Sequence, residues 1–354
     1  MKYSIVIPTY NGEKFIYETL TSACFQERLA DEIIIYDDGS KDRTLEICRS
    51  DAFKEKIQIY ENKNGPSGFV NSWKKAIGKA KYNYVTLLHQ DDLLHHSYLR
   101  VIENALKDYP DVRHIYSACN YIDEYGNVTR EPPKPLSLEP ILYSGKEYRH
   151  NYLQSVAFRR HIHRCPGVTT SRELLDICPY REEAGHIADD DFFYRIGKYT
   201  DVLGISAPLA SYRAHRNSET GRLEEKEFIY RLARDYVFQC NFHSNFEYFE
   251  LSDVNTLNRL AVKYINLLLR YGLVSGRKEI VTSALQFKQI FRLTSKYNIY
   301  KYSSWRYKII WLGSSFVKKN NMNYFLNYMM KMARIKRRLS KRSRKLSFFD
   351  LKLD

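Results

Sequence analysis

The stretch Tyr84-Val-Thr-Leu-Leu-His-Gln-Asp-Asp92 starts as a short apolar run and ends on two adjacent carboxylates. The apolar run predicts a buried strand that delivers Asp91 and Asp92 to the edge of a sheet. Burying unpaired carboxylates is costly, so a purely structural strand has no use for them. They could open a turn and cap the following helix. They could also hold a divalent cation, because open α/β sheets bind ligands at the carboxyl ends of their strands and Mg²⁺ or Mn²⁺ takes oxygen ligands.

Three similar units precede this stretch, and each joins a strand to a polar loop and a helix. Segment 4–8 runs into the turn 9–12, segment 32–36 ends on Asp37 and Asp38, and segment 57–60 leads to the glycine loop 64–68. This alternation is typical of an α/β fold with a doubly wound, mostly parallel sheet flanked by helices. Right-handed crossovers then place every strand end at one edge. Neither G-x-G-x-x-G nor a phosphate loop occurs at these loops, which argues against a dinucleotide enzyme or a P-loop ATPase.

The motifs resemble those of the inverting family 2 glycosyltransferases with the GT-A fold. They are Ile5-Val-Ile-Pro-Thr-Tyr-Asn11, Glu32-Ile-Ile-Ile-Tyr-Asp-Asp-Gly-Ser40, Asn64-Gly65 and the Asp91-Asp92 pair. The resemblance implies a nucleoside-diphosphate sugar as donor, with UDP favoured as the nucleotide. It implies a donor site formed by Pro8, Thr9, Tyr10, Asp38, Asn64, Gly65, Gln90, Asp91, Asp92 and Arg195. From the residues alone, Asp37 and Asp38 could instead only cap the next helix.

The resemblance also implies a divalent metal, Mn²⁺ or Mg²⁺, held by Asp91 and His215. This chain departs from the family at His89, which stands where members commonly carry the first acid of a D-x-D motif. A neutral imidazole can ligate Mn²⁺. The other interpretation of His89 is a histidine hydrogen-bonded inside the sheet. The same two interpretations, ligand and structural residue, apply to His215.

A second acidic centre lies in Gly185-His-Ile-Ala-Asp-Asp-Asp-Phe-Phe-Tyr-Arg195. One carboxylate at the start of a helix is favoured by the helix dipole, but three exceed what capping requires. The resemblance implies that Asp189, six residues before Arg195, is the general base, with Ala188 where many members have glutamate. Upstream, segment 158–164 gathers five basic or titratable side chains ending at Arg164. It could bind a diphosphate or an anionic acceptor, or be a solvated basic turn.

The remainder of the chain differs in composition from the catalytic part. Formal net charge over 354 residues is +15, and nine basic residues without an acid fall in 331–345. Helical apolar spacing recurs in 228–238, 254–271 and 279–291. We therefore predict a GT-A domain over 1–218, an α-helical appendage over 219–321 and an amphipathic basic tail over 322–354. The tail suits a helix lying in an anionic membrane interface. Nucleic acid is disfavoured because no stacking platform accompanies the charge, and self-association of the apolar stripe is the third interpretation.

The resemblance implies a non-processive transferase that adds one sugar to a hydroxyl on a glycan or lipid-linked acceptor in cell-surface glycan or polysaccharide assembly. The processive Q-x-x-R-W motif does not occur. Six scattered cysteines favour reduced thiols. No apolar run reaches a membrane span and no signal peptide is evident, so we expect a cytoplasmic protein at the inner face of the membrane. Two alternatives are a catalytically idle protein that binds nucleotide sugars or glycans, and a membrane or nucleic-acid scaffold that acts through its tail. The oligomeric state is not predicted.

Overall fold

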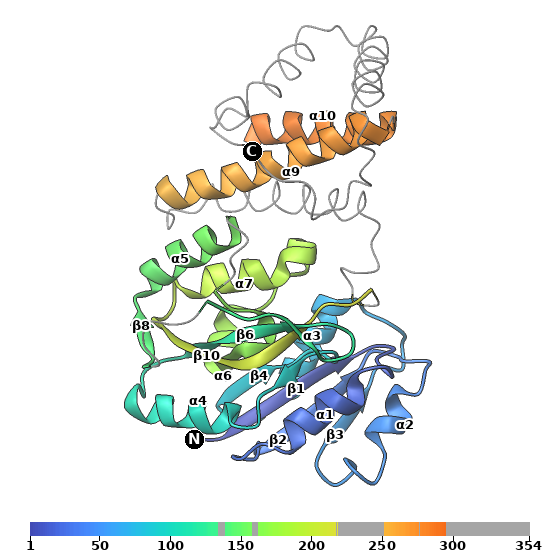
Figure 1. The fold of residues 1–354 in the computed structure, drawn as a ribbon, viewed down its shortest axis with the longest axis vertical. Coiled ribbons are helices and arrows are strands. Elements are labelled where there is room, and N and C mark those ends of the chain that lie inside the picture. The colour runs from blue at the N-terminus through green and yellow to red at the C-terminus, as the bar shows by residue number, and fades with distance from the viewer. Residues whose placement is uncertain (134–138, 158–161, 217, 219–250, 276, 295–354) are drawn as a thin grey trace, which may run out of the picture. The chain divides into compact units, whose positions relative to one another are not determined.

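The computed structural model describes residues 1–133, 139–157, 162–216, 218, 251–275 and 277–294. The chain divides into two compact units, Met1–Gly221 and Arg222–Asp354. The first unit holds a single ten-stranded sheet with the strand order β3-β2-β1-β4-β9-β6-β10-β5, and two short strands, β7 and β8, pair with β6 and β10. Helices cover this sheet (Figure 1). The α/β class predicted from the sequence is thereby confirmed.

The first half of the sheet follows the predicted units. Strands β1 (Tyr3–Thr9), β2 (Glu32–Asp37), β3 (Gln58–Glu61) and β4 (Tyr84–Leu87) are parallel to one another. Helices α1 (Ile16–Cys24), α2 (Thr44–Cys48) and α3 (Phe69–Lys79) connect them. Runs such as Ile33-Ile34-Ile35 form strands because β-branched side chains pack well in a sheet that is covered on both faces.

The second half of the sheet departs from a parallel arrangement. Strand β9 (Val168–Ser171) lies antiparallel between β4 and β6 (His114–Ile122), while β10 (Val202–Arg213) runs parallel to β6. Short strands β5 (Leu93–Leu94), β7 (Val128–Arg130) and β8 (Ile141–Tyr143) are also antiparallel to their neighbours. The sheet is therefore mixed. The expectation that every strand ends at one edge fails for β9 and for the short strands β5, β7 and β8, but the carboxyl ends of β1, β2, β4, β6 and β10 do share an edge.

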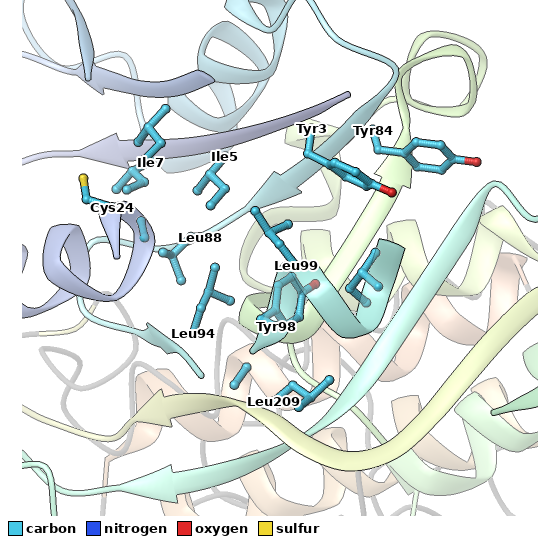
Figure 2. Close-up of a cluster of buried hydrophobic side chains, with 14 of the residues drawn as sticks. Tyr3, Ile5, Ile7, Cys24, Tyr84, Leu88, Leu94, Tyr98, Leu99 and Leu209 are labelled. Atoms are coloured by element: carbon cyan, nitrogen blue, oxygen red, sulfur yellow. The ribbon is translucent and has the colours of Figure 1, made fainter. Parts of the chain in front are cut away.

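The core beneath the first half is built from the most apolar strands and two helices. Side chains of β1, α1, α4 (Tyr98–Asp108) and β10 interlock, as Figure 2 shows for Ile5, Leu99 and Leu209. Burying one large apolar side chain contributes roughly 1.5–3 kcal/mol, so this cluster fixes the strands whose ends form the site. The remaining helical segments of the unit are α5 (Gly145–Ala157), η1 (Cys165–Gly167), α6 (Arg172–Ile177), η2 (Glu182–Ile187) and α7 (Ala188–Ile196).

The second unit contains two described helices, α9 (Leu251–Ser275) and α10 (Lys278–Thr294), which pack against each other. A Cβ atom on Gly272 would lie 2.8 Å from the backbone nitrogen of Val281, so glycine permits this close approach. Both helices match segments with helical apolar spacing. The third predicted helical segment, 228–238, and the basic tail, 322–354, lie outside the described residues.

Candidate active site at the carboxyl edge of the sheet

The loop after β2 and the loop before α3 form one polar unit. Asp38 is 2% exposed, and its carboxylate accepts hydrogen bonds from Asn62 Nδ2 (2.7 Å), Ser67 Oγ (2.8 Å) and the Ser67 backbone N–H (2.7 Å). Asn62 also donates to the carbonyl of Gly65 at 2.6 Å. The predicted donor residues Asp38, Asn64 and Gly65 are thus brought together. Asp38 fixes the shape of this loop, and reading of the nucleotide base by Asp38 stays a prediction.

Asp37, directly before Asp38, has a structural use. Its carboxylate accepts from the backbone N–H groups of Gly39 (3.1 Å) and Ser40 (2.9 Å) and from the hydroxyl of Thr9 (3.1 Å). Thr9 and its neighbour Pro8 are buried at the end of β1. The adjacent carboxylates therefore have different roles. Asp37 joins the turn after β2 to the end of β1, whereas Asp38 fixes the loop before α3.

Gln90 joins the end of β4 to the loop after β1. Its side-chain oxygen accepts from the Tyr10 N–H at 2.8 Å, and its Nε2 donates to the Tyr10 carbonyl at 3.2 Å. The backbone carbonyl of Gln90 accepts from the hydroxyl of Thr19 on α1 at 2.9 Å. Because the oxygen and the nitrogen of its side-chain amide both form hydrogen bonds with Tyr10, Gln90 fixes the loop of Tyr10 beside Asp91 without contributing a charge.

Asp91 and His215, the two predicted metal ligands, are in contact. His215 Nε2 lies 2.7 Å from Asp91 Oδ2, and the side chains of these residues are 4% and 18% exposed, respectively. The ring of Phe15 packs on the imidazole with a centroid distance of 4.4 Å. The two residues come from β-strand ends 124 positions apart, and the fold alone brings them together.

Arg213 is a site residue that the sequence analysis missed. It is 1% exposed, its backbone N–H donates to Asp92 Oδ1 at 2.8 Å, and its Nε donates to the Asp91 carbonyl at 2.8 Å. Its guanidinium pairs with Glu18 and lies 4.8 Å from the centroid of the Phe15 ring. Arg213 therefore fixes the turn that carries both acids. Its only sequence signal is its position two residues before His215.

Asp92 and His89 are enclosed beside this turn. Asp92 is 1% exposed, and burial raises the pKa of its carboxyl well above the ordinary value, with a further contribution from Asp91. His89 Nδ1 lies 3.6 Å from Asp92 Oδ2, and its ring stacks on Trp73 at a centroid distance of 4.8 Å. Burial lowers the pKa of the His89 imidazole, so a neutral histidine occupies the place of the first acid.

The three carboxylates of the second centre have three different environments. Asp191 is paired with Arg181 and Arg195, and Asp190 accepts from the Tyr152 hydroxyl at 2.6 Å. Asp189 is half-buried, and its Oδ1 accepts from the Asp190 N–H at 2.9 Å. Burial, reinforced by Asp190, raises the pKa of Asp189 to about 7. Among the three, Asp189 thus has the pKa of a useful base at neutral pH.

Arg195 does not join the donor residues in this structure. Its Nε donates to Asp191 at 2.9 Å and its Nη2 donates to the Pro179 carbonyl at 2.6 Å. These contacts join the last turn of α7 to its first turn and to the segment that holds Pro179. The donor-binding role predicted for Arg195 stays a prediction, because the guanidinium is already engaged by Asp191.

The charges of the two acidic centres act on a common phenol, that of Tyr212. The pKa of Tyr212 is raised to about 12, chiefly by burial; the charge of Arg164 lowers it, and those of Asp92, Asp91 and Asp189 raise it. Carboxylates act on a phenol in this way only over short distances, because Coulomb interactions weaken with separation and with screening. The structure therefore brings the end of β4 and the start of α7 to the same part of the sheet edge.

The site fits a metal that completes its coordination on a substrate. Among the described residues, no group of three or more His, Cys, Asp or Glu side chains is arranged to hold an ion. Asp91 and His215 do supply one oxygen and one nitrogen within 2.7 Å of each other. Mg²⁺ and Mn²⁺ sites often use one or two protein ligands together with substrate phosphates, so this pair suits a metal–diphosphate complex rather than an all-protein metal cage.

Comparison with known proteins finds similar glycosyltransferases. A family model described as "Glycosyl transferase family 2" matches residues 4–166. Uncharacterised glycosyltransferases of Rickettsia are similar: that of R. typhi is 27% identical over 235 residues, or 64% of this chain and 70% of the relative. The chain covers only 35% and 34% of the R. felis and R. conorii proteins. The Campylobacter jejuni GalNAc(5)-diNAcBac-PP-undecaprenol beta-1,3-glucosyltransferase is 24% identical over 258 residues, or 68% of this chain and 79% of that protein.

Solved structures share the fold. Staphylococcus aureus TarS 1–349 in complex with UDP-GlcNAc superposes with a TM-score of 0.62 at 15% identity, covering 97% of this chain and 93% of TarS 1–349. The mannosyltransferase PcManGT of Pyrobaculum calidifontis, in complex with GDP-Man and Mn²⁺, gives a TM-score of 0.50 at 15% identity, covering 96% and 88% of the two chains. The architecture of this chain is accordingly the GT-A fold.

Proposed function

We propose that this chain, whose residues 4–166 match the glycosyl transferase family 2 model, transfers a single sugar, with inversion, from a UDP-sugar to an acceptor hydroxyl. The observation that carries the proposal is Asp189, a half-buried carboxylate at the start of α7 whose pKa is raised to about 7 and whose charge acts on Tyr212 together with those of Asp91 and Asp92. A base works best when its pKa lies near the working pH. Asp189 meets that condition beside the acids assigned to the donor.

The proposed reaction is one displacement. Asp189 accepts the proton of the acceptor hydroxyl while the acceptor oxygen forms a bond to the anomeric carbon of the sugar, and the bond from that carbon to the diphosphate breaks. The pair Asp91 and His215 would hold the divalent metal, which, when bound, stabilises negative charge on the departing diphosphate. Gln90 and Arg213 keep the turn of Asp91 in place. The loops fixed by Asp37 and Asp38 surround the place proposed for the nucleotide.

The proposed acceptor is a glycan or a lipid-linked glycan in cell-surface assembly. Support comes from the similar C. jejuni protein, whose name describes an undecaprenol-linked acceptor. TarS of S. aureus, which is 29% identical to this chain over 127 residues, is named for a poly(ribitol-phosphate) acceptor. The absence of Q-x-x-R-W from the sequence supports single-sugar transfer.

The test is turnover of nucleotide sugars by the purified full chain. We expect release of nucleoside diphosphate from a UDP-sugar in the presence of Mn²⁺. Asp189→Asn should keep UDP binding, measured by calorimetry, and lower turnover by ~10² or more, because a general base acts in the transition state. Asp91→Asn should lose UDP–Mn²⁺ binding and turnover together. Nucleotide binding without turnover of any sugar tested would favour the idle binding protein, and full activity in Asp189→Asn would remove its role as base.

A further inference from the structure

Arg164 is held between the two acidic centres by two tyrosines. Its Nε donates to the Tyr121 hydroxyl at 2.9 Å, and its guanidinium carbon lies 5.7 and 5.4 Å from the ring centroids of Tyr121 and Tyr212. Tyr121 lies near the carboxyl end of β6 and Tyr212 near that of β10, so the guanidinium is placed by the same sheet edge that carries the catalytic groups. An arginine oriented by both a hydrogen bond and ring contacts loses little further freedom when it binds a ligand.

The rest of this guanidinium has no partner in the described part of the chain. No carboxylate there forms an ion pair with Arg164, and neither of its Nη groups donates a hydrogen bond to those residues. The Nη atoms are also absent from the buried polar atoms without partners, so solvent reaches them. Four N–H donors therefore remain available on a half-buried cation.

The charge of Arg164 nevertheless acts on both acidic centres. It lowers the pKa of Asp92 on one side and of Asp189 on the other, against the larger effect of burial on each. Arg164 thus lies near the donor acids and near the proposed base without being neutralised by contact with either. A structural arginine of this burial would ordinarily pair with one of them.

A second cation strengthens the site. The guanidinium carbon of Arg130, on β7, lies 3.8 Å from the centroid of the same Tyr121 ring. One phenol therefore contacts two guanidinium groups. Two positive charges that contact the same side chain repel each other, and an anion bound near both relieves that repulsion. Arginine is also the side chain whose fork matches phosphate oxygens with two parallel N–H···O bonds.

We propose that Arg164, supported by Arg130, binds a phosphate group of a substrate at this edge of the sheet. The inference rests on the proposed function, which supplies two sources of phosphate: the diphosphate of the donor sugar, and a phosphate within a lipid-linked or polyol-phosphate acceptor. Both present the same oxyanion to the Nη edge of Arg164.

The test is calorimetric titration of the full chain with inorganic pyrophosphate in the absence of added metal, so that only protein groups hold the anion. Arg164→Gln should weaken pyrophosphate binding by about tenfold or more, because it removes a charge-assisted two-bond contact. Arg164→Lys keeps the charge but loses the two-pronged guanidinium geometry, so its affinity for pyrophosphate should lie between those of wild type and Arg164→Gln. Arg100→Gln is the matched control, because Arg100 is an exposed arginine of α4 paired with Glu27. Thermal unfolding checks that each variant folds. If Arg164→Gln does not fold, the pyrophosphate affinity of Arg164→Lys relative to wild type decides the proposal.

Repeating the wild-type titration at saturating UDP identifies the source. Displacement of pyrophosphate by UDP assigns the site to the donor diphosphate, whereas simultaneous binding assigns it to an acceptor phosphate. Equal binding by wild type and Arg164→Gln, or no binding by wild type at millimolar pyrophosphate, overturns the proposal. Absence of sugar transfer would instead remove the proposed function, and the pyrophosphate titration would still decide the role of Arg164.

Discussion

At the scale of single residues, three neighbouring aspartates have different roles because their surroundings differ. Asp189, Asp190 and Asp191 are consecutive, yet Asp191 is paired with two arginines, Asp190 accepts a hydrogen bond from a tyrosine hydroxyl, and Asp189 has no cation in contact among the residues that the structure describes. The sequence shows three acids at a helix start and does not show which one faces the site. The assignment of Asp189 came from a family motif, whereas the partners Arg181 and Tyr152 come from elsewhere in the chain.

The raised pKa of Asp189 predicts how activity depends on pH. Only the ionised carboxylate accepts a proton, so kcat/KM should rise about tenfold per pH unit below the pKa of about 7 and level off above it. We expect this limb in a pH profile of wild-type turnover. A profile that is flat from pH 5 to 8 would show that the group titrating near 7 does not act in the reaction.

The same pKa affects stability with a definite sign. An unfolded aspartate loses its proton near pH 4, whereas native Asp189 keeps it until about pH 7. The native state therefore binds more protons between these values, and its free energy of unfolding falls as the pH rises through this range. Asp189→Asn should consequently gain stability relative to wild type at pH 8 but hardly at pH 4, which urea denaturation at the two pH values would measure.

At the scale of elements, the sequence predicted what is local. Strands β1 to β4 with their loops, and the helix of the second acidic centre, follow from hydrophobic runs ended by polar residues. The antiparallel strand β9 was not predicted, because Val168-Thr-Thr-Ser171 is short and its pairing with β4 depends on distant partners, such as the Thr86 and Thr169 hydroxyls 2.7 Å apart. Arg213 was not predicted as a site residue for the same reason, because its contacts with Asp91 and Asp92 span more than a hundred residues.

The contact between Gln90, after β4, and the loop after β1 predicts that a methyl group added at Gly12 will weaken nucleotide binding. A Cβ on Gly12 would overlap the side-chain oxygen of Gln90, which is bonded to Tyr10. Gly12→Ala should therefore displace the Gln90 amide and weaken UDP binding by about tenfold, since losing one such contact costs about 1–1.5 kcal/mol.

A double-mutant cycle isolates this cause. In a Gln90→Ala background the obstacle is gone, so adding Gly12→Ala should change UDP affinity and unfolding free energy far less than it does in wild type. If the two substitutions simply add, the methyl group acts through something other than the Gln90 contact.

At the scale of the whole molecule, charge is unevenly distributed. Of the formal net charge of +15, nine basic residues stand together in 331–345, within the tail that lies outside the described residues. In the described part of the chain, no helix is long and apolar enough to cross a bilayer. We propose that the tail binds an anionic membrane surface at the inner face of the membrane, where each basic residue can add about 1 kcal/mol.

Truncation after Asn320 tests the tail. The shortened protein should fold and keep nucleotide binding, because the residues that match the family 2 model end at 166. It should bind phosphatidylserine-containing vesicles much more weakly at low salt. Neutral phosphatidylcholine vesicles are the control for apolar adsorption. Equal vesicle binding by the full and shortened chains would exclude the tail as the membrane contact.

The long separation between the site acids and their partners has a consequence for synthesis on the ribosome. Asp92 is made 121 residues before Arg213, and Asp91 is made 124 residues before His215. At roughly 5–20 residues per second, the nascent chain carries the unpaired acids for on the order of ten seconds after their translation. Strands β1 to β4 can pair during that interval, but the turn of Asp91 waits for the last strand of the sheet. A nascent chain that ends at residue 200 would therefore lack β10, and with it the contacts of Arg213 and His215 with the turn of Asp91.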